Sequence, residues 1–125
     1  MRWNAWWLSC KLAWGQRSFR ILSVLIVAVM VIAILFFSEQ VIAMGRHHET
    51  LAVHYNVYVG IDNVQRWQWS LLLPLGWCLF TLSDIGLAYV TYRRDREAAV
   101  SLLVFAGLGG LPWMAFLFYL TVLNR

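Results

Sequence analysis

The sequence predicts an all-α integral membrane protein with three transmembrane helices, and three observations lead to this prediction. Of the 125 residues, 62% are hydrophobic and only 13% are charged, whereas about 25% of the residues of a soluble domain are charged. Three long apolar runs occupy most of the chain, and the charged residues gather between them. We therefore expect residues 1–125 to form a single membrane domain, with no room for a separate soluble catalytic domain.

Residues 1–20 have the composition of a membrane interface. They contain four basic residues, no acidic residue and four tryptophans, which are Trp3, Trp6, Trp7 and Trp14. The tryptophans are spaced so that a helix would gather indole rings on one face. One interpretation is an amphipathic interfacial segment lying in the headgroup region. The other is the aromatic belt and positive flank of the first span.

The first transmembrane helix is predicted over residues 21–44. Residues 21–38 carry no charge, and about 20 apolar residues are needed to cross a hydrocarbon core of about 30 Å. A basic flank followed by an apolar run also resembles a signal peptide. The run is longer than the usual apolar region of such a peptide, about 7 to 15 residues, and is followed by Glu39 and Gln40. We expect it to remain uncleaved.

Residues 45–66 form the longest polar stretch and are predicted to be an external loop. Apolar and polar residues alternate with a period of two over residues 51–62, which is typical of an extended segment. A lone strand is not stable. The segment must therefore pair with another strand, pack on the helices or lie along the membrane surface.

The second and third transmembrane helices are predicted over residues 67–92 and 98–123, joined by a charged cytoplasmic turn at 93–97. Trp67 and Trp69 are expected at the membrane interface. Pro74 and Pro112 each remove a backbone donor and crowd a carbonyl four residues earlier, which predicts a bend in each helix.

The distribution of Lys and Arg predicts the orientation. The N-terminal segment and the 93–97 turn hold seven basic residues, whereas the 45–66 loop and the C-terminus hold three. Because basic residues resist translocation, we expect a multi-pass protein of the cell membrane with a cytoplasmic N-terminus and an external C-terminus. The net charge of +4 is then an orientation signal and predicts no binding of nucleic acid.

Two groups of ionisable residues are candidates for chemistry. Asp84 is the one ionisable side chain well within a span, and a carboxylate at membrane depth is costly. It either has a role with a proton or a partner, or forms a structural hydrogen bond. The second group is formed by the loop residues His47, His48, Glu49 and His54. Their spacing matches no established metal site, and we predict no metal.

The centre of the third span is a candidate for close helix packing. Ala106 and Gly110 form a pair of small residues four positions apart, which allows another helix to approach. That helix belongs either to this chain or to another protein. The sequence contains no nucleophile–base pair and no phosphate-binding loop, so we predict neither enzymatic activity nor a cofactor.

The loop and the start of the second span carry a family resemblance. The run from Val53 to Asp62 reads VHYNVYVGID and is followed by Trp67, Trp69 and a Leu-Pro pair at 73–74. It resembles a family of small, uncharacterised bacterial three-span proteins. More distantly, it is similar to SdpI-like immunity and signalling proteins, which usually have proline where this chain has Ala52 and Ile61, and have more spans.

The resemblance implies the topology given above and implicates four loop residues, namely His54, Asn56, Gly60 and Asp62. From the residues themselves, Gly60 permits a turn with positive φ, and the polar side chains can cap the turn. We expect a non-enzymatic protein in the lipid bilayer that works as an accessory subunit beside other membrane proteins. The alternative is an SdpI-like immunity or signalling protein that recognises an external peptide through residues 47–62.

Overall fold

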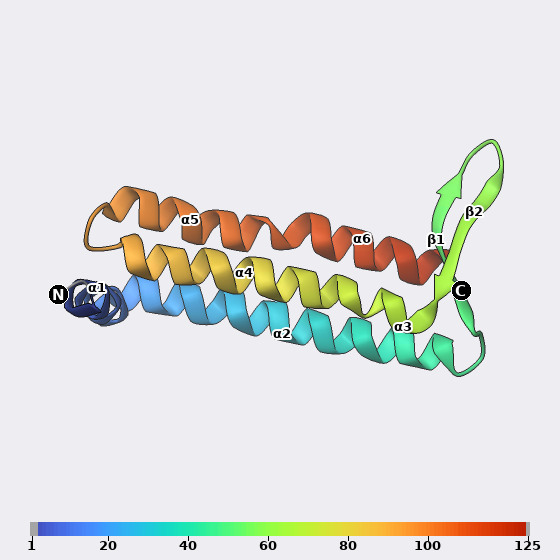
Figure 1. Ribbon diagram of the computed structural model, residues 1–125, viewed down its shortest axis with the longest axis horizontal. Coiled ribbons are helices and arrows are strands. Elements are labelled where there is room, and N and C mark those ends of the chain that lie inside the picture. The colour runs from blue at the N-terminus through green and yellow to red at the C-terminus, as the bar shows by residue number, and fades with distance from the viewer. Residues whose placement is uncertain (1–2, 125) are drawn as a thin grey trace. The chain divides into compact units, whose positions relative to one another are not determined.

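The computed structural model describes residues 3–124, apart from the side chains of Trp3, Asn56 and Asp62. The chain is mainly helical, as predicted, and also contains a small β-sheet (Figure 1). Its elements are α1 (Trp3–Gly15), α2 (Arg17–Gly45), β1 (Thr50–Asn56), β2 (Gly60–Arg66), α3 (Trp67–Ser70), α4 (Leu72–Thr91), α5 (Arg96–Leu108) and α6 (Gly110–Leu123).

Three helical segments are long and apolar enough to cross a membrane. They run from Arg17 to Gly45, from Trp67 to Thr91 and from Arg96 to Leu123, and they coincide closely with the predicted spans 21–44, 67–92 and 98–123. The third begins after the turn because the Asp95 carboxylate accepts a hydrogen bond from the Ala98 amide, 2.9 Å away. This is an N-cap, which satisfies one of the free amides of the first helical turn.

The second and third spans are each interrupted once, where the sequence predicts a bend. Leu71 separates α3 from α4, and Gly109 separates α5 from α6. In each case a proline follows closely, and its ring excludes the hydrogen bond that would continue the helix. At the second interruption the Gly109 amide donates to the Phe105 carbonyl over 2.7 Å.

The sheet corrects the prediction of an all-α protein with a single extended loop segment. β1 and β2 pair antiparallel, and the chain turns between them at residues 57–59. The predicted extended segment therefore folds back on its own continuation. Gly60 has a φ of 83°, which confirms the predicted positive-φ turn. The register shifts on both sides of His54, so the hairpin contains bulges that increase its twist.

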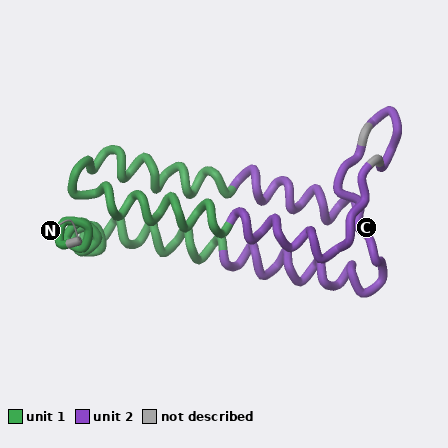
Figure 2. The backbone as a smooth tube through the Cα atoms, viewed as in Figure 1, with its two compact units in different colours: residues 1–30, 78–110 green, residues 31–77, 111–125 purple. Residues whose placement is uncertain are grey.

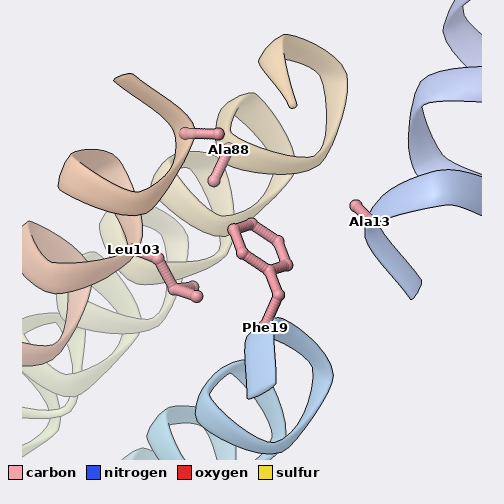
Figure 3. Close-up of a cluster of buried hydrophobic side chains, with 5 residues drawn as sticks. Ala13, Phe19, Ala88 and Leu103 are labelled. Carbon is pink, nitrogen blue, oxygen red and sulfur yellow. The ribbon is translucent and has the colours of Figure 1, made fainter. Parts of the chain in front are cut away.

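The chain divides into two compact units (Figure 2). Unit 1 consists of residues 1–30 and 78–110. Its core is a cluster of small and aromatic side chains in which the Phe19 ring lies between Ala13, Ala88 and Leu103 (Figure 3). The Phe19 ring also meets the edge of Tyr92, with centroids 4.8 Å apart. Small residues on α1 and α4 thus let the helices close around one ring.

Unit 2 consists of residues 31–77 and 111–125 and contains the hairpin. Its buried apolar side chains are Phe37, Val41, Leu51, Ala52, Trp77, Leu117 and Leu120. At the end of α2, the chain passes so close to Trp67 that a β-carbon on Gly45 would lie 2.5 Å from the indole ring. The hairpin therefore starts from a tightly packed base.

Candidate functional site

The base of the hairpin is held by the side chain of Asn124, just beyond α6. Its Oδ1 accepts a hydrogen bond from the Ala52 amide over 2.7 Å, and its Nδ2 donates to the Ala52 carbonyl over 2.8 Å. The same Nδ2 donates to the Leu120 carbonyl over 2.8 Å. The side-chain amide thus occupies the outer edge of β1 as another strand would, and it also closes the end of α6.

The tip of the hairpin has the opposite character from its base. Leu51 and Ala52 are buried, whereas Val57, Tyr58 and Val59 at the turn are 83, 96 and 73% exposed. Exposing three apolar or aromatic side chains in succession to water is unfavourable, and residues at exposed turns are normally polar. The hairpin presents this apolar tip from a fixed base, which is the arrangement of an interaction site.

The four loop residues implicated by the resemblance all lie on this hairpin. His54 is an exposed residue of β1 opposite Asn63, and Gly60 begins β2 opposite Asn56. Asp62 belongs to β2. The backbone therefore brings the four positions onto one small sheet, but the side chains of Asn56 and Asp62 lie outside the described part of the structure.

A polar cleft of about 320 Å³ lies at the foot of the hairpin. It is lined by Gly45, Glu49, Thr50, Arg66, Trp67 and Gln68. The Trp67 amide donates to the Glu49 carbonyl over 3.4 Å and so continues the strand pairing to this point. A carboxylate, a guanidinium and an amide in one cleft can bind the polar backbone of a peptide.

The loop histidines do not assemble a metal centre within the described part of the chain. Among the described side chains, no group of three or more His, Cys, Asp or Glu is placed to hold a metal ion. His47 and His48 are exposed residues before β1, whereas His54 lies within the strand.

Asp84 is a half-buried residue of α4. No described residue donates a hydrogen bond to its carboxylate. The neighbouring Ser83 hydroxyl donates instead to the Leu79 carbonyl over 2.7 Å, and the buried Thr81 hydroxyl has no partner among the described residues. A structural hydrogen bond from either side chain therefore does not account for this acid.

The small-residue pair of the third span is buried within the chain. Ala106 is 2% exposed, and Gly110 is buried as well. The neighbouring Gly107 faces Ile26 of α2, whose Cδ1 would lie 3.4 Å from an added β-carbon. Packing among the helices of this chain accounts for the close approach at this position.

The N-terminal tryptophans lie on α1, which is a helix separate from α2. Trp6, Trp7 and Trp14 are exposed, as is Trp69 of α3, whereas Trp67 is half-buried. The side chain of Trp3 lies outside the described residues.

Sequence reasoning missed Ser9, which fastens α1 to the end of α4. Its buried hydroxyl lies 2.8 Å from the Tyr89 carbonyl and 2.9 Å from the Val90 carbonyl, to which it donates, and it accepts from the Arg93 amide over 3.0 Å. A serine among tryptophans carries no signal of such a contact, since the partners are backbone groups far along the chain.

In comparisons with models of protein families, with curated proteins and with solved structures, no match to this chain was found. The residues of the hairpin and of α1 are therefore the basis for assigning a function. The hairpin offers an apolar surface at Val57, Tyr58 and Val59 and a polar cleft containing Glu49 and Arg66.

Proposed function

We propose that this protein is a non-enzymatic integral membrane protein that works as an accessory subunit of a larger membrane complex and contacts it through the tip of the β1–β2 hairpin. The observation that carries the proposal is the exposure of Val57, Tyr58 and Val59 on a hairpin whose base is fixed. An apolar patch rimmed by polar residues marks a contact site on a protein surface.

The energetics of the tip suit a protein partner. Burying one valine side chain contributes about 1.5 to 3 kcal/mol. The bidentate contact between Asn124 and Ala52 fixes the hairpin base before any partner binds, which lowers the conformational entropy lost on association. A few well-placed apolar side chains on a fixed hairpin are therefore enough to anchor a contact that the helices strengthen within the bilayer.

The proposed location is a bacterial inner membrane, with the N-terminus in the cytoplasm and the hairpin and C-terminus outside. The uneven distribution of basic residues supports this orientation. Two contacts agree with it. Ser9 bonds to Arg93, which suits a common side for α1 and the 93–97 turn, and Asn124 bonds to Ala52, which suits a common side for the hairpin and the end of α6.

The proposal is tested by purifying the full chain from its native membrane in mild detergent and measuring the stoichiometry of co-purifying proteins by mass spectrometry. The wild type is expected to bring down one or more subunits in fixed ratio. The double variant Val57→Ser/Val59→Ser is expected to lose them, because serine removes the apolar contact area of the tip without shortening the hairpin.

His47→Ser/His48→Ser serves as the matched control, since it changes two exposed residues before β1 and leaves the tip intact. It should retain the subunits. Isolation of the wild type without any stoichiometric partner would contradict the proposal, as would a tip variant that retains the same partners as the control.

The outer edge of β2 favours a second candidate, an SdpI-like immunity or signalling protein that recognises an external peptide through residues 47–62. Among the described residues, the sheet consists of β1 and β2. An exposed strand edge can pair with an extended peptide, and the cleft containing Glu49 and Arg66 lies at its foot.

For this second candidate, deletion of the gene should make cells sensitive to a secreted toxic peptide. His54→Ala or Asp62→Ala should reproduce that sensitivity. Unchanged sensitivity in all three strains would remove the candidate and leave the accessory-subunit proposal untouched.

A further inference from the structure

A cleft of about 440 Å³ in unit 1 combines aromatic walls with a cation. It is lined by Trp7, Cys10, Lys11 and Trp14 of α1 and by Tyr89 of α4. The Lys11 side chain and the rings of Trp7 and Trp14 are exposed at its mouth, with Trp7 68% exposed. An ammonium group beside exposed indole rings is a combination typical of the headgroup layer of a membrane.

The walls of this cleft are held in place by named contacts. The Trp14 and Tyr89 rings have centroids 6.4 Å apart, and the Tyr89 hydroxyl donates to the Ser23 hydroxyl over 3.2 Å. The Arg20 guanidinium lies over Trp14, 5.8 Å from the ring centroid. A second cation therefore lies on the same tryptophan that lines the cleft.

Basic side chains outnumber acidic ones in unit 1. Its described residues include six Lys and Arg side chains but only three Asp and Glu side chains. The hydrogen bond from the Arg93 amide to Ser9 fastens the arginine-rich turn to α1, and the exposed side chains of that turn include Arg93, Arg94 and Arg96. The Asp95 carboxylate in the same turn already accepts from the Ala98 amide.

We infer that this cleft binds the headgroup of an anionic phospholipid, with the phosphate at Lys11, the Arg20 guanidinium over Trp14 adding positive charge nearby, and the glycerol and upper acyl chain against Trp7 and Trp14. The inference rests on the proposed membrane location. A zwitterionic lipid offers the same apolar body without net negative charge, so the cations make the cleft selective for acidic lipids. The exposed indoles favour a lipid over an acidic peptide because they suit an apolar acyl chain next to a headgroup.

The test measures lipid binding to the full chain in mild detergent by native mass spectrometry. The probes are phosphatidylglycerol and phosphatidylcholine with identical acyl chains, and inorganic phosphate in a third arm. Phosphatidylglycerol is expected to bind more tightly than phosphatidylcholine, and millimolar inorganic phosphate is expected not to displace it. Displacement of phosphatidylglycerol by inorganic phosphate would contradict the assignment to a lipid and would show that the cleft is an anion site only.

Substitutions locate the site. Each basic side chain near an anionic surface contributes about fivefold in binding, so Lys11→Gln/Arg20→Gln should weaken phosphatidylglycerol binding about 25-fold. Lys11→Gln alone should weaken phosphatidylglycerol binding about fivefold. Because Lys11 is exposed, this variant leaves the packing of Arg20 against Trp14 unchanged. Arg46→Gln/Arg66→Gln is the control, because it removes two charges from unit 2.

Equal affinity for the two lipids would overturn the inference, as would an equal loss in the control. A stoichiometric protein released by Lys11→Gln, with no lipid selectivity, would assign the surface to a protein instead. The hairpin-tip variant should bind phosphatidylglycerol normally. If the wild type captures its subunits but shows no preference for phosphatidylglycerol, this inference alone is rejected. If the wild type prefers phosphatidylglycerol but captures no subunit, the accessory-subunit proposal alone is rejected.

Discussion

The side-chain amide of Asn124 forms two hydrogen bonds with the backbone of Ala52, 72 residues earlier in the chain. One amide group thereby replaces a strand at the outer edge of β1. A two-stranded hairpin is at best marginally stable by itself in water. This contact, together with the burial of Leu51 and Ala52, supplies the additional interactions that keep the hairpin ordered at its base.

Asn124→Ala is expected to loosen the hairpin. It leaves the amide and carbonyl of Ala52 without their side-chain partner, and an unsatisfied buried polar group costs about 1 to 3 kcal/mol. Hydrogen–deuterium exchange in detergent should become faster across β1 and β2. Thr121→Val is the control, since the Thr121 hydroxyl donates to the Phe118 carbonyl of its own helix and to no other group among the described residues. Equal exchange in both variants would contradict the role of Asn124.

Ser9→Ala is expected to release α1 from the end of α4. The change removes the acceptor of the Arg93 amide and the donor to two carbonyls, at a cost of about 1 to 3 kcal/mol. Trypsin should then cleave at the exposed Lys11 and Arg17 more quickly. Cleavage of Ser18→Ala, which alters an exposed serine, should match the wild type. If Ser9→Ala is cleaved no faster than Ser18→Ala, the hydroxyl does not fasten α1.

Two glycine substitutions should have opposite effects on stability. Gly45→Ala places a β-carbon 2.5 Å from the Trp67 ring, so the indole must move and the hairpin base is disturbed. Gly86→Ala meets nothing within 4 Å and should stabilise α4 by about 0.5 to 1 kcal/mol. Thermal unfolding in detergent should give a lower midpoint for the first variant and a higher one for the second. A midpoint unchanged by Gly45→Ala would argue against the tight packing.

Asp84→Leu should make insertion of the second span more favourable. A carboxylate within a span opposes insertion, and we expect a gain of about 1 to 3 kcal/mol when it is replaced by an apolar side chain. The measurement is the inserted fraction of residues 67–92 in a glycosylation-mapping assay. Ser83→Leu, one residue away, should give a smaller gain. Loss of subunit capture in Asp84→Leu, with folding intact, would instead assign the acid to a partner.

The sequence predicts the helices well because their signals are local. The limits of an apolar run follow from composition, and the proline-linked bends follow from the missing amides of Pro74 and Pro112. The observed spans differ from those predicted by a few residues at their ends. The positive φ of Gly60 was likewise predictable, since it depends on one residue type.

The hairpin and its anchor were harder to predict. The regular alternation over residues 51–62 continues through the turn, because Val57 and Val59 are apolar like the strands beside them. The flanking Asn56 and Gly60 are the signal that a turn lies between them. The roles of Asn124 and Ser9 depend on backbone groups more than 70 residues away in the sequence, so no local pattern could reveal them.

The interruption at Gly109 has a consequence for how the sequence can vary. A β-carbon at this position would lie 3.0 Å from the Phe105 carbonyl oxygen, a backbone atom that cannot move aside without distorting α5. Any side chain larger than hydrogen at this position would therefore have to displace the backbone at the junction of α5 and α6.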